Sequence, residues 1–294
     1  MIPYYQFALY ASITLSGLFL LKWNKHISAS FTIIYLLLPF INIGYLRVAV
    51  AENIEEAILA NGLVYLCSCF LQFGYMAYVF SFCKLKLPKP MAAVLFSLNG
   101  LIGSTALTTL QNKALYSSAE LILDEQLGTH YIEKTYGPLH TVYIFLLLFY
   151  FVTELVALVY GFRRKDVSKK NLLIIFSIYL VNFMSFVGTR LSGLHLELQP
   201  AAYILSQCVL LYMSIKLKKY SEDDTAANSI IEEGKTGFVS FDLSKHYLGS
   251  SGHALDYLPE LRELYIDGPL YENRPEYDYI RELVAKVEAT GHPA

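Results

Sequence analysis

The sequence predicts a membrane protein: an all-α seven-helix bundle followed by a small cytosolic α+β domain. The 294 residues are 55% hydrophobic and only 16% charged, whereas an ordinary soluble domain is about 25% charged. Most charged residues lie in the last third or between long apolar stretches. The net charge is only −2, so no basic excess predicts binding to nucleic acid.

Seven apolar stretches are of the length that crosses a bilayer, which takes about 20 residues of helix. They cover residues 3–21, 28–50, 57–83, 90–110, 137–161, 171–191 and 200–215. The first stretch is not expected to be a cleaved signal peptide. No basic residue precedes it, and Lys22, Lys25 and His26 follow it.

The distribution of basic residues predicts the orientation. Thirteen Lys and Arg residues fall in one set of connections, and four fall in the alternate set. Cytosolic connections carry the excess of positive charge in membrane proteins. We therefore expect the N-terminus outside the cell and the C-terminal tail in the cytosol.

The longest outside connection covers residues 111–136 and is acidic. Its length is sufficient for a helix that would cap an outward-facing cavity. A solvated connector without such a role is an equal alternative.

Residues 200–219 join the two parts of the chain. This apolar helix ends at Lys216, Lys218 and Lys219, after which the composition becomes polar and acidic. We expect a membrane domain at residues 1–219, a linker helix at 220–236 and a cytosolic domain at 237–294. A signal received by the membrane domain is expected to pass through the joining helix.

The tail has the pattern of two strands followed by helices. Residues 237–243 alternate like a strand, Ser244 and Lys245 form a turn, and residues 246–250 form a second strand. The chain becomes helical from Gly252. A last helix is expected at residues 275–289, because Ile280, Leu283 and Val287 fall on one face.

Two segments resemble a known family. Tyr136-Gly137-Pro138-Leu139 resembles the start of the fifth span in the bacterial seven-transmembrane sensor region at the N-terminus of some histidine kinases. The order of spans and the basic connection after the fifth agree with this layout. Residues 237–261 resemble the opening of a PAS domain, with strand, turn, strand and short helices.

The resemblance implies a sensor of the bacterial inner membrane that detects an unknown small ligand or a membrane signal. It also implies a homodimer and an output domain, either a histidine kinase of a two-component system or a diguanylate cyclase. The PAS-like domain is expected to be incomplete here, with the output beyond Ala294 or in another chain. This chain alone is therefore not predicted to be an enzyme.

Three polar residues inside the predicted spans are candidates for ligand binding. Glu154 lies within the fifth stretch, and an ionisable group at membrane depth is a functional candidate because its burial is costly. The alternative is a protonated or water-reached acid that only packs in the bundle. Asn182 and Gln207 lie in the sixth and seventh stretches, where they could instead hydrogen-bond between helices.

Three further candidates lie near the outer ends of the spans: Arg47, His140 and Arg190. If they converge, they form an electropositive pocket for an anionic ligand. The alternative is that each side chain extends separately to the membrane interface.

The motifs exclude several other functions. No HExxH motif, P-loop or pair of nucleophile and base is present. His246 and His253 are isolated, and the tail has no cysteine, so no metal or cofactor is predicted. A transporter-like protein with a regulatory tail remains the alternative, although seven spans do not divide into two equal inverted halves.

Overall fold

The computed structural model describes residues 1–22, 29–191, 193, 195–231, 237–242, 244–270 and 277–290; for residues 216–231 it describes the backbone. The chain forms two compact units. The first comprises Met1–Val159 and Ile174–Lys218, and the second comprises Tyr160–Leu173 and Lys219–Ala294.

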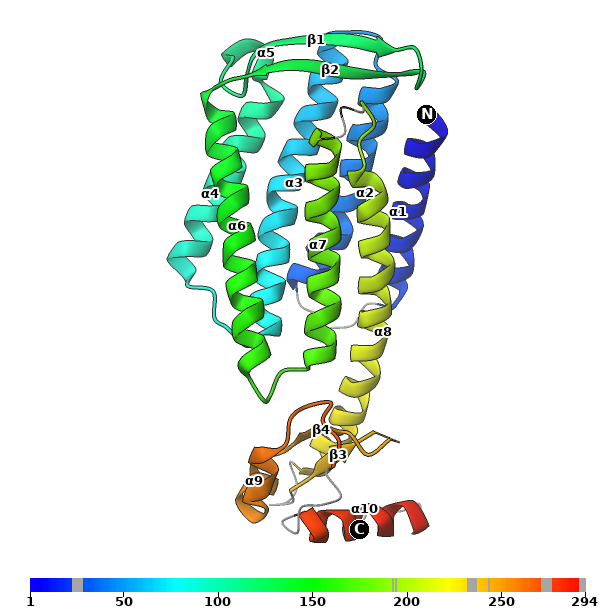
Figure 1. The fold of residues 1–294 in the computed structure, drawn as a ribbon, viewed down its shortest axis with the longest axis vertical. Coiled ribbons are helices and arrows are strands. Elements are labelled where there is room, and N and C mark those ends of the chain that lie inside the picture. Colours follow the sequence, from blue (N-terminus) through cyan, green and yellow to red (C-terminus); the bar gives the residue numbers. More distant parts are fainter. Residues whose placement is uncertain are drawn as a thin grey trace. The chain divides into compact units, whose positions relative to one another are not determined.

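The first unit is a bundle of long helices that extend side by side (Figure 1). Their bounds are α1 Ile2–Lys22, α2 Ala29–Ala49, α3 Ile54–Phe82, α4 Lys89–Leu107, α6 Pro138–Arg163, α7 Lys169–Leu191 and α8 Gln199–Ile231. Among the described residues, six of them (α1, α2, α3, α4, α6 and α7) are long and apolar enough to cross a membrane.

The surface of the first unit agrees with a membrane environment. Large apolar side chains such as Phe7, Phe145 and Val156 are each more than 60% exposed. Soluble proteins rarely expose apolar surface on this scale, whereas lipid tails cover it readily. The six apolar helices and their exposed faces together indicate a multi-pass membrane protein.

The seventh predicted span lies in the first half of α8, which packs in the bundle through hydrogen bonds to α1 and α2. The hydroxyl of Tyr35 donates to the backbone oxygen of Gln207 at 2.6 Å. The Gln207 side chain donates to Ser16 Oγ at 3.1 Å, and Ser16 donates to the backbone oxygen of Tyr35 at 2.7 Å. That this part of α8 also crosses a membrane stays a prediction.

The helix α8 continues without a break to Ile231. Residues 220–231 of the predicted linker helix are therefore part of α8 and do not form a separate helix. Residues 232–236 of the predicted linker lie outside the described residues. Residues 221–227 contain no glycine or proline, so no strong helix breaker ends the helix where the apolar segment stops.

Local signals set the start of α3 and its packing on α4. The Asn53 side chain accepts a hydrogen bond from the backbone nitrogen of Glu56 at 2.9 Å, which caps the helix. Farther along α3, Gly62 lies against α4. A Cβ atom there would be 2.9 Å from the Cα of Leu107 and 3.0 Å from the Ala106 oxygen.

The connection at residues 111–136 forms a β-hairpin and not the helix that its length allowed. Its strands are β1 Tyr116–Asp124 and β2 Thr129–Tyr136, paired antiparallel, and a short α5 Thr109–Asn112 precedes them. Asp124 Oδ1 accepts from the backbone nitrogens of Gln126 and Leu127, and Gly128 adopts a φ of +62°. Such a turn, flanked by β-branched and aromatic residues, favours a hairpin.

The hairpin lies across one end of the bundle (Figure 1). The amino group of Met1 donates to the backbone oxygen of Leu127, so α1 begins at this same end. The hairpin is also joined to the core, because Asn61 on α3 donates to the hydroxyl of Tyr116 at 2.7 Å.

The second unit has its own small core. Strands β3 Val239–Phe241 and β4 Tyr247–Ser250 pair antiparallel, and α9 Gly252–Tyr257, the 3₁₀-helix η1 Pro259–Glu263 and α10 Asp278–Thr290 follow. Its buried apolar residues are Tyr247, Ala254, Leu261, Leu264, Leu270, Tyr277 and Ile280. The predicted order of strand, strand and helices is confirmed; a PAS fold stays a prediction.

The last helix begins at Asp278, three residues after its predicted start. Residues 271–276, where the predicted start falls, lie outside the described residues. The second unit also includes the connection between α6 and α7. The ammonium of Lys165 lies 2.8 Å from a carboxylate oxygen of Glu263, and the backbone nitrogen of Ile266 donates to the Lys165 oxygen at 3.0 Å.

The close approach at Gly62 gives a stability prediction. We expect Gly62→Ala to lower the free energy of unfolding by about 1 to 3 kcal/mol, because overpacking forces α3 and α4 apart. Gly100→Ala is the matched control. No atom lies within 4 Å of the added Cβ there, so it should be neutral or slightly stabilising. Thermal unfolding in detergent measures both, and equal midpoints would contradict the prediction.

Candidate ligand-binding site

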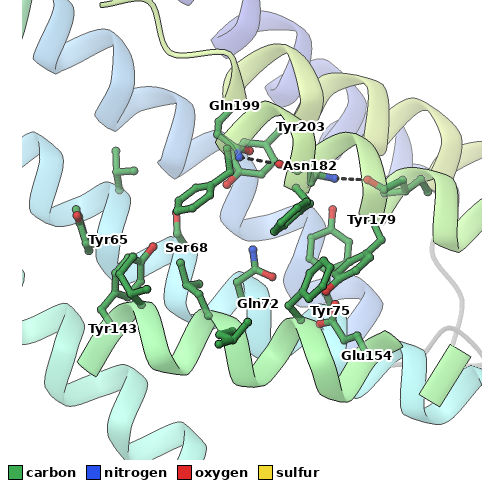
Figure 2. A pocket seen from close by; sticks show the side chains of 18 of the residues that line it. Tyr65, Ser68, Gln72, Tyr75, Tyr143, Glu154, Tyr179, Asn182, Gln199 and Tyr203 are labelled. Carbon is green, nitrogen blue, oxygen red and sulfur yellow. Dashed lines mark hydrogen bonds between the residues drawn. The ribbon is translucent and has the colours of Figure 1, made fainter. Parts of the chain in front are cut away.

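A cavity of about 270 Å³ lies inside the first unit. Helices α2, α3, α6, α7 and α8 line it together with strand β2. Figure 2 shows side chains of α3, α6, α7 and α8 in its wall. Seven of the described tyrosines contribute to its wall: Tyr45, Tyr65, Tyr75, Tyr78, Tyr143, Tyr179 and Tyr203. The ionisable residues of the wall, other than these tyrosines, are Lys134, Glu154, Arg190 and Glu197.

One face of α3 supplies a large share of the polar lining. Asn61, Tyr65, Ser68, Gln72 and Tyr75 recur every three or four residues, so they lie on one side of the helix. Polar residues within a span are costly in lipid and therefore face the interior of a bundle. This spacing in the third stretch is the sequence signal that would have identified the α3 wall.

The hairpin end of the cavity is defined by Lys134 on β2, Arg190 at the end of α7 and Glu197 before α8. The ammonium of Lys134 donates to Asn61 Oδ1 at 3.5 Å. Burial lowers the pKa of Lys134, and the nearby Arg190 lowers it further while Glu197 opposes the change. This end therefore carries two cations and one carboxylate.

The segment that holds Glu197 is anchored to α1 and to the hairpin. The hydroxyl of Tyr4 donates to the backbone oxygen of Glu197 at 2.9 Å, and the Glu197 nitrogen donates to the hydroxyl of Tyr5 at 3.2 Å. The ring of His195 stacks on Tyr131 of β2, with 3.8 Å between centroids. These contacts hold the start of α8 against the hairpin end.

The Glu154 end of the cavity contains a fully buried carboxyl group. Glu154 on α6 is 0% exposed. Among the described residues, neither of its oxygens has a hydrogen-bond partner. The hydroxyls of Tyr75 on α3 and Tyr179 on α7 are also buried without a partner, and their side chains extend beside Glu154 (Figure 2). The ring of Phe151 stacks on Tyr179 at 5.1 Å.

Between the two ends, amide groups join α7 to α8. Asn182 Nδ2 donates to Ser206 Oγ at 2.7 Å, and Gln199 Nε2 donates to the backbone oxygen of Asn182 at 2.9 Å (Figure 2). The side-chain oxygens of Asn182 and Gln199 are buried without a partner in the described chain. Both helices therefore present free acceptors in the cavity wall.

The cavity brings together three of the six residues proposed from the sequence: Glu154, Asn182 and Arg190. Gln207 is buried but does not line the cavity, and its side chain donates a hydrogen bond to Ser16 on α1. Its position therefore fits the alternative of an interhelical hydrogen bond.

Of Arg47, His140 and Arg190, only Arg190 lines the cavity. Arg47 lies on the exposed face of α2. His140 is buried next to the cavity wall, with its ring stacked on Tyr136 at 3.7 Å and its Nδ1 3.5 Å from the hydroxyl of the lining residue Tyr65. Lys134 and Glu197 complete the hairpin end instead, and only the tertiary structure brings them there.

The described residues contain no group of three or more His, Cys, Asp or Glu that could hold a metal ion. No protein-family model, curated protein or solved structure was found to match the chain.

The partly buried position of Lys134 gives a pH-dependent prediction. Protonated Lys134 is disfavoured in the folded state, so it lowers stability below its depressed folded pKa. This cost disappears as the pH rises toward the usual value of 10.5. We expect Lys134→Met to raise the unfolding temperature at pH 7. The difference in unfolding temperature between this variant and wild type should become smaller toward pH 10.

The exposed Lys86 is the matched control for this experiment. Lys86→Met removes the same charge outside the cavity and should leave the unfolding temperature unchanged at both pH values. Differential scanning fluorimetry in detergent measures all three proteins. A Lys134→Met protein that is less stable than wild type at pH 7 would contradict the argument.

Proposed function

We propose that this chain is the input module of a bacterial membrane sensor. A small ligand binds in the cavity of the bundle and changes the packing of the helices, and α8 passes that change to the second unit. One observation carries the proposal: α8, the helix that continues into the second unit, lines the cavity with Gln199, Tyr203 and Leu210.

The bonds that hold α8 in place support such coupling. Asn182 and Gln199 join α7 to α8 at the cavity wall, where their free oxygens can accept hydrogen bonds from a ligand. Hydrogen bonds between membrane helices average only about 0.6 kcal/mol. A ligand can shift the bundle between two packings if it binds one of them better, and energies of this size are within the reach of a small molecule.

The proposed output is a histidine kinase or a diguanylate cyclase, either continuous with this chain or in a partner, and the proposed assembly is a homodimer. These parts rest on the resemblance of the spans and the tail. The proposal places the protein in the bacterial inner membrane, with the hairpin outside the cell and the second unit in the cytosol.

Cysteine labelling tests this orientation. Glu125 lies in the hairpin turn and Lys86 in the connection between α3 and α4, and both are exposed. In a background where the exposed Cys208 is replaced by serine, we expect a membrane-impermeant maleimide to label Glu125→Cys in intact cells. Lys86→Cys should react only after lysis. The reverse pattern would contradict the proposed orientation.

A pocket-filling substitution tests the coupling to α8. Ser68 on α3 faces the cavity near Tyr203 of α8 (Figure 2). We expect Ser68→Trp to occupy the cavity and to change amide hydrogen exchange in α8 beyond Ile215. The expected change is about threefold, the factor that corresponds to one interhelical bond of about 0.6 kcal/mol.

Phe145→Trp is the matched control, because Phe145 is 66% exposed on α6. It adds a tryptophan at an exposed position of the bundle and should leave exchange in α8 unchanged. Exchange would be measured by mass spectrometry on the full chain in lipid nanodiscs. Changes confined to the cavity wall, with α8 beyond Ile215 as in wild type, would contradict the sensor and favour the transporter-like alternative.

A further inference from the structure

The Glu154 end of the cavity lacks a partner for its carboxyl group. Both oxygens of Glu154 are buried without a hydrogen bond in the described chain. Burying such a group is costly unless donors or a cation satisfy it. The only described Lys and Arg residues that line the cavity are Lys134 and Arg190, and both lie at the hairpin end.

Lys134 and Arg190 are too far from the Glu154 end of the cavity to form a salt bridge with Glu154. Tyr179, whose side chain lies beside Glu154, and Arg190 are about three turns of α7 apart, about 16 Å along the helix axis. A salt bridge requires charged atoms within about 4 Å. Without a cation in the cavity, a carboxyl group in this position is expected to be neutral, and a cationic molecule would supply the partner that its ionised form lacks.

The walls at the Glu154 end match an ammonium group. By hydrogen-bond geometry, the hydroxyls of Tyr75 and Tyr179 have no partner among the described residues, and each can accept a hydrogen bond. The aromatic rings of Tyr75, Tyr179 and Phe151 line the same end, and aromatic faces attract cations. A primary ammonium has three N–H donors, so it can bond to the Glu154 carboxylate and to both hydroxyls together.

We infer that the Glu154 end binds the ammonium group of an organic primary amine whose apolar body extends along the tyrosine-lined cavity. This inference names the ligand class of the proposed sensor and rests on that function. The hairpin end sets the orientation of the amine in the cavity, because Lys134 and Arg190 disfavour a second cation at that end. A carboxylate ligand in the same place would face the carboxyl group of Glu154.

Binding of simple probes to the full chain in detergent tests the inference. Equilibrium dialysis would compare 2-phenylethylamine with its neutral analogue 2-phenylethanol and with the anion 3-phenylpropionate. We expect saturable binding of the amine that is at least tenfold tighter than that of either analogue. Equal or tighter binding of the alcohol or the anion, or no binding of the amine, would overturn the inference.

Substitutions locate the site of the ammonium group. Glu154→Gln keeps the volume of the side chain and should weaken amine binding at least tenfold. Tyr179→Phe keeps the ring, removes the hydroxyl and should weaken binding severalfold. Glu133→Gln changes an exposed carboxylate on β2 that does not line the cavity, so binding should be unchanged. If Glu197→Gln lowers the affinity for the amine more than Glu154→Gln does, the ammonium group lies at the hairpin end and the inference is overturned.

The exchange measurement separates this inference from the sensor proposal. If Ser68→Trp alters exchange in α8 but the amine does not bind, the ligand class is wrong and the sensor stands. If the amine binds through Glu154 but leaves exchange in α8 unchanged, the amine site stands and the sensor is contradicted.

Discussion

The structure depends on the cost of placing polar groups inside an apolar bundle. In lipid, a polar side chain must find a partner within the protein. Most of the buried polar residues obey this rule: Asn61 bonds to Tyr116, Asn99 to Tyr150, Asn182 to Ser206 and Gln207 to Ser16. The exceptions among the described residues include Glu154, Tyr75, Tyr78 and Tyr179, and all four line the cavity. Their grouping is what distinguishes a binding site from structural hydrogen bonding.

The same requirement explains the position of α8. Its backbone and side chains bond to α1 and α2 on one side, through Tyr35, Ser16 and Gln207. On the other side Ser206 and Gln199 bond to α7. The helix is thus held by individual polar contacts, several of which lie at the cavity wall. Polar contacts of this kind can be exchanged for contacts with a ligand, whereas apolar packing offers no such substitution.

Sequence patterns predict the helices more readily than they predict the directions in which the side chains of those helices point. Arg47, His140 and Arg190 lie at similar depths in their spans, but the direction of each side chain depends on the rotation of its helix about its axis. Arg47 faces outward, His140 packs on Tyr136, and only Arg190 lines the cavity. The length of residues 111–136 alone does not distinguish a helix from the hairpin at residues 116–136, whereas the Asp124 turn and the β-branched flanks favour strands.

The amino-acid sequence alone predicts a membrane protein with long apolar helices, a polar tail of strands and short helices, and a costly carboxyl group at Glu154. These properties follow from hydrophobic length, local periodicity and composition, which act along the chain. The cavity that Glu154, Asn182 and Arg190 share with Lys134, Glu197 and seven tyrosines is seen only in the folded bundle. That assembly depends on how five helices and a hairpin rotate and pack against one another, and such contacts join residues that are far apart in sequence.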